Sequence, residues 1–248
     1  NPQDTWPLRK CYSHLKCTSR RLRFMRGQPR RLSMIVTCRN QGRELVNIVE
    51  SFRRYLSQYG ELIIVDAGST DPITPQLEDW YQETGFKLLR TSDTSLSRAR
   101  KEGLQKATAS VVFAMDADWN FDPGLLLKSL EILETDADIS FVSSGLRDQG
   151  SNFTWLPKSA ALQDILACPY LCFPVVRRTS LLDLGGYDDS FSDPRQADSD
   201  LAIRLAKSGL KGVVISEPLL YQAQFMLGAW SNKSESQQSF ILPLLKKH

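Results

Sequence analysis

Residues 110–119 have the sequence Ser-Val-Val-Phe-Ala-Met-Asp-Ala-Asp-Trp, an apolar run that ends in two carboxylates. The uninterrupted apolar and small residues from Val111 to Met115 are typical of a strand buried on both faces of a parallel sheet. Ligands of open α/β sheets bind at the carboxyl ends of the strands, which is where Asp116 and Asp118 fall. Because they are two positions apart, their side chains point the same way from an extended chain. Such a pair suits a hard divalent cation and with it a diphosphate, although a simple turn or helix cap is the alternative.

Strands and helices alternate on both sides of this run, which predicts βαβ units and a mostly parallel, Rossmann-like sheet flanked by helices. Before the run, the apolar patterns predict strands at 32–36, 62–65 and 86–89, and helices at 42–60 (ended by Gly60), 72–84 and 95–107. After it, they predict helices near Pro123 and at 197–208, and strands at 139–143, 171–176 and 211–215, with 144–163 as a loop. We therefore expect a single α/β domain over 32–227, between a basic arm at 1–31 and a weakly patterned tail at 228–248.

The composition is that of an ordinary globular protein, with 42% hydrophobic and 24% charged residues in a chain of 248. The formal net charge of +3 hides a basic arm, because residues 1–31 carry nine Lys and Arg and a single acid, Asp4. This arm could touch a membrane surface, a nucleic acid or another domain, or be a solvated linker.

Several classes of protein are excluded by pattern. No apolar run approaches the ~20 residues of a transmembrane helix. The five cysteines fit neither a zinc pattern nor a disulfide framework. Without a helix-turn-helix or an aromatic-basic pattern, we expect no nucleic-acid partner. The sequence leaves the location open between the cytoplasm and a membrane surface.

Four motifs occur in an order that resembles the family 2 glycosyltransferases, which have the GT-A fold. Val65-Asp-Ala-Gly-Ser-Thr-Asp71 resembles their VDxGSxD segment, and Ser97-Arg-Ala-Arg-Lys-Glu-Gly103 is similar to their ARN-x-G helix. Met115-Asp-Ala-Asp118 is similar to their DxD motif. Gly185-Gly-Tyr-Asp188, followed by residues 197–209, resembles their GGFD or GGYD and ED-x-DL ending. Each motif alone is weak, but four in the right order make a strong signal.

The resemblance covers roughly residues 32–215 and implies an inverting glycosyltransferase that uses a nucleotide-diphospho sugar, with UDP as the expected nucleotide and Mn²⁺ or Mg²⁺ as cofactor. It implies hexosyl or N-acetylhexosaminyl transfer to a hydroxyl of a glycan, lipid-linked or other acceptor. It also implies a nucleotide-binding half at 32–120 and an acceptor-binding half at 121–227. The alternatives are a non-catalytic binding module that keeps the fold and, less well matched, a nucleotidyltransferase. The latter class begins with a glycine-rich phosphate loop, which residues 37–42 match poorly.

The resemblance assigns the donor site to Thr37, Arg39, Asp66, Arg100 and Asp116. The carboxylate of Asp66 would accept a hydrogen bond from a nucleobase imide, although it could instead cap a turn. Thr37 and Arg39 would line the base pocket, where the family commonly has an aromatic residue in the place of Arg39. Arg100 would bind phosphate through two donors, unless it lies on a solvated helix face. Asp116 would contact the ribose or a metal-bound water.

Asp118 is the expected metal ligand, because a cation there would neutralise the charge of the leaving diphosphate. Asp198 is the expected general base, since an acceptor hydroxyl must lose its proton in the transition state. Ala197 replaces the family's acidic neighbour of this base, so Asp200 is the substitute. Both aspartates could instead simply complement the dipole of a helix N-terminus.

Three further side-chain types bear on the site. The two histidines, His14 and His248, stand near the ends of the chain, so we expect no histidine ligand to the metal. Trp119 and Trp155 are candidates to stack on a sugar, although a Trp is more often part of the core. The family's Asn after the motif arginine is Lys101 here, which is a departure from the pattern.

Overall fold

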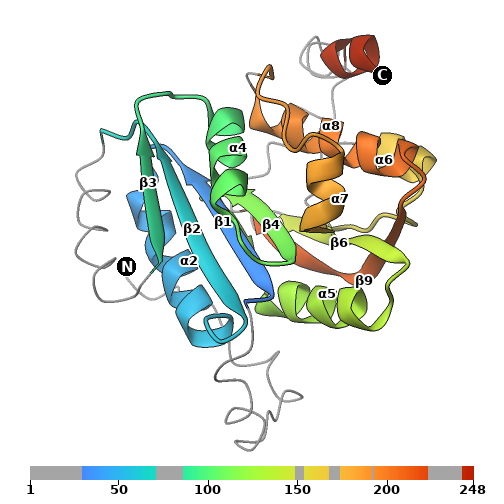
Figure 1. The fold of residues 1–248 in the computed structure, drawn as a ribbon, viewed down its shortest axis with the longest axis horizontal. Helices are drawn as coiled ribbons and strands as arrows, with labels where there is room; N and C mark the ends of the chain where they lie inside the picture. Colours follow the sequence, from blue (N-terminus) through green and yellow to red (C-terminus); the bar gives the residue numbers. More distant parts are fainter. Residues whose placement is uncertain (1–29, 71–85, 149–153, 168–173, 192, 223–241) are drawn as a thin grey trace, which may run out of the picture.

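The computed structural model describes residues 30–70, 86–148, 154–167, 174–191, 193–222 and 242–248. Within them the chain forms one sheet with helices on both of its faces (Figure 1). Nearly all of the basic arm, and the helix expected at 72–84, lie outside the described residues. None of the described helices is both long enough and apolar enough to cross a membrane.

The first half of the sheet is parallel and follows the predicted alternation of strands and helices. Its elements are β1 (Leu32–Cys38), α2 (Gly42–Tyr55), β2 (Gly60–Ala67), β3 (Lys87–Thr91), α4 (Leu96–Lys106) and β4 (Val111–Asp116). β1 pairs in parallel with β2 and β4, and β2 pairs in parallel with β3. The strands expected in this half are confirmed, as is the helix at 95–107, whose N-cap is Ser95.

The second half is mixed. Its elements are β5 (Trp119–Phe121), α5 (Pro123–Thr135), β6 (Ile139–Asp148), β7 (Thr154–Trp155), α6 (Leu162–Ala167), β8 (Val175–Arg177), α7 (Arg178–Asp183), α8 (Pro194–Lys207) and β9 (Lys211–Gln222). β8 is antiparallel to β4 and β6, β9 is parallel to β6, and β5 is antiparallel to β9. The described strands thus form a nine-stranded sheet in the order β3-β2-β1-β4-β8-β6-β9-β5, with β7 paired to β6.

Each face of the sheet has its own core, because successive strand residues point to opposite faces. Met34 and Val36 of β1 belong to the core that contains α2 and α5. Ile35 belongs to the core that contains α4, α7 and α8. Gly103 lets α4 lie directly on this second face, since a Cβ there would be 2.5 Å from Cγ2 of Ile35.

The end of the first helix was placed wrongly by the sequence pattern. The helix ends at Tyr55, and Gly60 is the first residue of β2 instead of the helix stop. Glycine is required there by close packing between strands, because a Cβ on Gly60 would lie 2.0 Å from the carbonyl oxygen of Leu32.

The expected loop at 144–163 is also wrong in part. Strand β6 continues to Asp148, because its pairing with β9 persists through register shifts on both sides of Gly145. For the same reason β9 extends to Gln222 and does not end near residue 215. The sequence pattern does not predict β5, α6 or α7. Of the strand expected at 171–176, the first three residues lie outside the described part.

The register of the parallel strands brings three predicted site residues, Thr37, Asp66 and Asp116, to one edge of the sheet. Thr37 of β1 is level with Asp116 of β4, and Cys38 is level with Asp66 of β2. Asp118 follows in the turn between β4 and β5. In α/β sheets this carboxyl edge is the place where ligands bind.

Candidate active site

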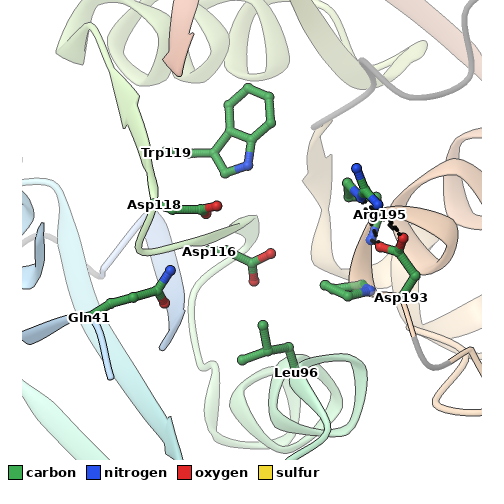
Figure 2. A pocket seen from close by; sticks show the side chains of 8 residues that line it. Gln41, Leu96, Asp116, Asp118, Trp119, Asp193 and Arg195 are labelled. Atoms are coloured by element: carbon green, nitrogen blue, oxygen red, sulfur yellow. Dashed lines mark hydrogen bonds and ion pairs between the residues drawn. The ribbon is translucent and has the colours of Figure 1, made fainter. Parts of the chain in front are cut away.

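A pocket of about 480 Å³ lies at the carboxyl edge of the sheet. The end of β4 and the start of β5 form one wall, and the N-terminus of α8 forms the opposite wall (Figure 2). The residue before α2 and the first residue of α4 complete the lining. The lining residues are Gln41, Leu96, Asp116, Asp118, Trp119, Asp193, Pro194 and Arg195.

The two aspartates of the β4 wall differ in exposure. Asp116 is buried, and its Oδ1 accepts a hydrogen bond from Oγ1 of Thr37. Asp118 is exposed, and its side chain lies beside Asp116 and Trp119 in the pocket (Figure 2). The end of the strand therefore carries one buried, hydrogen-bonded carboxylate and one carboxylate that is exposed in the pocket.

The opposite wall is an aspartate–arginine pair at the start of α8. Asp193 is the N-cap, and its Oδ1 accepts the backbone N–H of Arg195 at 2.9 Å. The guanidinium of Arg195 donates to the same carboxylate, from Nε to Oδ1 at 3.0 Å and from Nη2 to Oδ2 at 2.6 Å. These hydrogen bonds, followed by the charges of Asp193, Asp118 and Asp116, raise the pKa of Arg195. Among the described residues that line the pocket, Arg195 is thus the one cationic side chain, and it lies opposite the acidic wall.

Neither Asp193 nor Arg195 is marked by the sequence motifs. A local signal was nevertheless present, because Asp followed by Pro is typical of an N-cap and the first position of a helix. The helix begins at Pro194, three residues before the expected start at 197. This earlier start places Asp193 and Arg195 at the pocket.

Arg100 lies behind the pocket and joins its two walls. Its side chain is fully buried, with Nη2 at 2.8 Å from Oδ2 of Asp116 and Nη1 at 2.5 Å from Oδ1 of Asp198. Nη1 also donates to the carbonyl oxygen of Pro194 at 2.9 Å, and the guanidinium lies 5.9 Å from the ring centre of Tyr187. Burial alone would lower the pKa of Arg100, but the two carboxylates raise it above its usual range. The expected contact with phosphate stays a prediction, since Arg100 does not line the pocket in this structure.

Asp198 lies in the second turn of α8 and is 4% exposed. Burial raises its pKa to about 7, although Arg100 acts in the opposite direction. Among the described residues, its Oδ2 has no hydrogen-bond partner. Asp200, the substitute base, is fully buried and accepts from Nε of Arg204 at 2.8 Å. Both aspartates pair with an arginine, but they differ in their second oxygen. Oδ2 of Asp198 has no partner among the described residues, whereas Oδ1 of Asp200 lies 2.6 Å from Nζ of Lys247.

The residues expected to hold the nucleobase, Asp66 and Arg39, lie at the same edge of the sheet but do not line this pocket. Asp66 is 3% exposed, and its Oδ1 accepts the backbone N–H of Ser69 at 2.9 Å, which is the turn-cap arrangement. Its Oδ2 lies 3.7 Å from Nε of Arg90. Arg39 is exposed, and its backbone N–H donates to Oε1 of Gln41.

The two candidate sugar-stacking residues, Trp119 and Trp155, lie in different environments in the structure. Trp119 lines the pocket, whereas Trp155 is partly buried and packs against the core.

Within the described ranges, no three His, Cys, Asp or Glu side chains converge as a metal site. The exposed carboxylate of Asp118 nevertheless fits Mg²⁺ or Mn²⁺, since both accept oxygen ligands and keep positions for substrate phosphate and water.

Comparisons with known proteins agree with this architecture. The family model described as glycosyl transferase family 2 matches residues 33–187, which is more than half of the chain. No curated protein sequence matches the chain at a significant level. Many solved structures are similar in fold.

Three of these structures illustrate the likeness. TarS from S. aureus superimposes with a TM-score of 0.67 at 14% identity, covering 78% of this chain and 37% of that one. TarS 1–349 in complex with UDP-GlcNAc gives 0.66 at 17%, covering 86% and 64%. The mannosyltransferase PcManGT from Pyrobaculum calidifontis, in complex with GDP-Man and Mn²⁺, gives 0.62 at 19%, covering 85% and 65%. The chain thus spans less than two thirds of each neighbour. At these identities the likeness shows the fold alone, and the expected GT-A fold is confirmed.

Proposed function

The chain belongs to glycosyl transferase family 2, and from the geometry of its site we propose that it transfers a sugar from a nucleotide-diphospho sugar to an acceptor hydroxyl. The observation that carries this proposal is the pocket in which Asp116 and Asp118 face the N-terminus of α8, the helix that contains Asp198. UDP is the proposed nucleotide and a hexose or N-acetylhexosamine the proposed sugar. Structures with UDP, UDP-GlcNAc and GDP-Man among the neighbours support a donor of this class.

On the donor side, Asp118 would hold the divalent cation, because its side chain is exposed in the pocket whereas that of Asp116 is buried. A bound Mn²⁺ or Mg²⁺ supplies charge neutralisation to the leaving diphosphate. Asp116 would orient the ribose or a water of the cation's shell. Thr37, Arg39 and Asp66, at the ends of β1 and β2, would hold the base of the nucleotide.

Arg100 would orient both carboxylates that act on the substrates. Its two ion pairs hold Asp116 on the donor wall and Asp198 in α8 in a fixed relation. The guanidinium is fully buried, so solvent and salt screen its two ion pairs much less than those at the surface. In this arrangement Arg100 would reach a donor phosphate only after leaving these ion pairs.

On the acceptor side, Asp198 would act as the general base. A pKa of about 7 suits this role, because an effective base has a pKa near the working pH. The buried Oδ2, which has no hydrogen-bond partner among the described residues, is the atom that would accept the proton of the acceptor hydroxyl. A single displacement opposite the leaving diphosphate would invert the anomeric centre. Asp193 is the nearest rival, since it lines the pocket directly.

Two isosteric variants separate these bases in a transfer assay with UDP-GlcNAc, UDP-glucose and GDP-mannose in Mn²⁺. Asp198→Asn should lower kcat by about 10²–10⁴, the usual contribution of a general base, and leave nucleotide affinity unchanged. Asp193→Asn should retain most of the turnover. The reverse pattern would move the base to Asp193. Nucleotide binding without turnover in the wild type would favour the non-catalytic module.

The pH dependence gives an independent check on Asp198. Because burial raises its pKa to about 7, its base form accumulates only as the pH rises through that value. The kcat/KM of the wild type should therefore increase between about pH 6 and pH 8 and level off above. The residual activity of Asp198→Asn should lack this rise, and a wild-type profile that is flat across the range would contradict the assignment.

A further inference from the structure

The last seven described residues, 242–248, pack on the helix that contains Asp198, although their sequence is weakly patterned. Residues 242–247 are helical, and Leu244 is 2% exposed in a small core with Phe191 and Ala197. The carbonyl oxygen of His248 accepts a hydrogen bond from Nζ of Lys207, the last residue of α8, at 3.0 Å. We call residues 242–248 the C-terminal clamp.

Lys247 is the centre of the contacts made by the clamp. Its Nζ lies 2.5 Å from Oδ2 of Asp188 and 2.6 Å from Oδ1 of Asp200, and 5.1 Å from the ring centre of Phe191. Nε2 of His248 lies 2.9 Å from the same oxygen of Asp200. Lys247 thus bridges the loop before α8 and the helix itself.

The contact has an electrostatic cause. Burial would raise the pKa of Asp188, but hydrogen bonds from Lys247 and Ser190 outweigh it and hold the pKa well below its usual range. Five aspartates occur between residues 188 and 200, whereas the segment contains one basic residue, Arg195. The clamp places the ammonium group of Lys247 against this acidic segment.

The loop at residues 184–189 is tied from two other directions as well. Arg204 of α8 donates to the carbonyl oxygens of Leu184 at 2.7 Å and Gly186 at 2.8 Å. On the other side, Nζ of Lys101 in α4 lies 2.9 Å from Oδ1 of Asp189. Lys101 is where the family has Asn, so this departure also supplies a charge to the loop.

Tyr187 is the residue that these contacts hold in place. It is 2% exposed and lies between Gly186, whose φ is 73°, and Asp188, which pairs with Lys247. Its ring faces the guanidinium of Arg100, and Arg100 in turn pairs with Asp198. A continuous series of contacts therefore leads from Lys247 to the proposed base. The family match ends at residue 187, so the clamp lies beyond it.

We propose that the C-terminal clamp is part of the catalytic unit and that Lys247 is a positioning residue, which fixes the loop at 184–189 and through Tyr187 and Arg100 the orientation of Asp198. The positioning role rests on the proposed function, whereas the docking of the clamp does not. Lys247 is about one-third exposed, so its ion pairs are partly screened. We therefore expect Lys247 to affect how well the loop at 184–189 is ordered and how fast the enzyme turns over, more than the global stability of the fold.

Hydrogen exchange of the whole chain, followed by mass spectrometry, tests the docking without any substrate. Lys247→Met should speed exchange of the amides at 184–191 and in the first turns of α8, and leave β1 and β2 unchanged. Lys246→Met is the matched control, because Lys246 is adjacent, exposed and makes no ion pair within the described residues. Lys247→Arg should restore protection. Equal exchange in the wild type and Lys247→Met would overturn the docking.

Steady-state kinetics with UDP-GlcNAc and Mn²⁺ test the positioning role. Lys247→Met should lower kcat by about threefold to tenfold with donor KM within about twofold, since no hydrogen bond or ion pair joins the described donor-side residues directly to the clamp. Lys246→Met and Lys247→Arg should remain near the wild type. Faster exchange with unchanged kcat would overturn the positioning role and leave a purely structural contact. If the wild type turns over no donor, the transferase proposal fails, while the exchange experiment still decides the docking.

Discussion

At the scale of one residue, the sequence predicts one of the two carboxylate partners of Arg100 and not the other. Its motif predicts an arginine at the donor site, and in the structure its guanidinium pairs with Asp116, another residue of the proposed site. Its second partner, Asp198, is 98 positions later in the chain and becomes a neighbour only because α8 packs against α4. Sequence spacing contains no information on that packing, so the link between the two walls could not be predicted.

Removal of the Arg100 side chain should therefore lower the free energy of unfolding by more than removal of a surface arginine does. Arg100→Ala would leave Asp116 and Asp198 buried without their cation, and breaking a buried ion pair in this way typically costs about 3–5 kcal/mol. Urea unfolding monitored by circular dichroism measures the free energy of unfolding. Arg98→Ala, on the same helix but with its side chain half exposed, is the control and should change stability by less than about 1 kcal/mol. A similar loss of stability in both variants would show that the buried ion pairs of Arg100 with Asp116 and Asp198 do not stabilise the fold.

At the scale of the element, the start of α8 is decisive. The apolar positions predict the helix over 197–208, but Asp193 and Pro194 begin it one turn earlier. That turn forms the pocket wall opposite Asp116 and Asp118. The motifs mark these two carboxylates, whereas Asp193 and Arg195 are indicated only by the Asp-Pro pair that begins the helix. Beyond the site, β6 and β9 are longer than their apolar cores because each supports the other along the sheet.

Strand β2 has a second charged feature at the opposite end from the site. Glu61 is 5% exposed and accepts from Oγ of Ser33 at 2.7 Å, Oγ1 of Thr108 at 2.7 Å, and the backbone N–H of Thr108 at 2.8 Å. Nζ of Lys87 lies 2.8 Å from its Oε2. Burial alone would raise the pKa of Glu61, but these bonds lower it to about 2.

This lowered pKa predicts a pH-dependent contribution to stability. A carboxylate whose pKa falls on folding stabilises the fold above its unfolded pKa near 4.5, and this contribution is lost as the pH drops toward 2. Glu61→Gln should lower the free energy of unfolding by about 1–3 kcal/mol at pH 7, and the difference from the wild type should shrink below about pH 4. Glu131→Gln, an exposed residue of α5, is the control. A difference that is independent of pH would mean that packing, not charge, is lost.

At the scale of the whole molecule, the two halves differ in how well sequence predicts them. The first half consists of parallel strands with helical crossovers, so apolar periodicity and motif order are enough to predict it. The second half depends on pairings such as β4 with β8 and β6 with β9, which join segments far apart in the chain. These pairings bring α8 across from the end of β4 and create the pocket. The fold class and the β4 carboxylates follow from the sequence, but the opposite wall follows only from the assembled sheet.

The most direct test of this site is calorimetric titration of UDP and GDP into the wild type and Asp118→Ala, with Mn²⁺ and with a chelator. We predict that one nucleotide binds only in the presence of Mn²⁺ and that Asp118→Ala weakens this binding at least about tenfold, because an exposed carboxylate ligand of the cation is lost. Glu131→Ala should bind like the wild type. A nucleotide affinity that changes neither on removal of Mn²⁺ nor in Asp118→Ala would contradict a donor site at the end of β4. The absence of binding of either nucleotide to the wild type would contradict it as well.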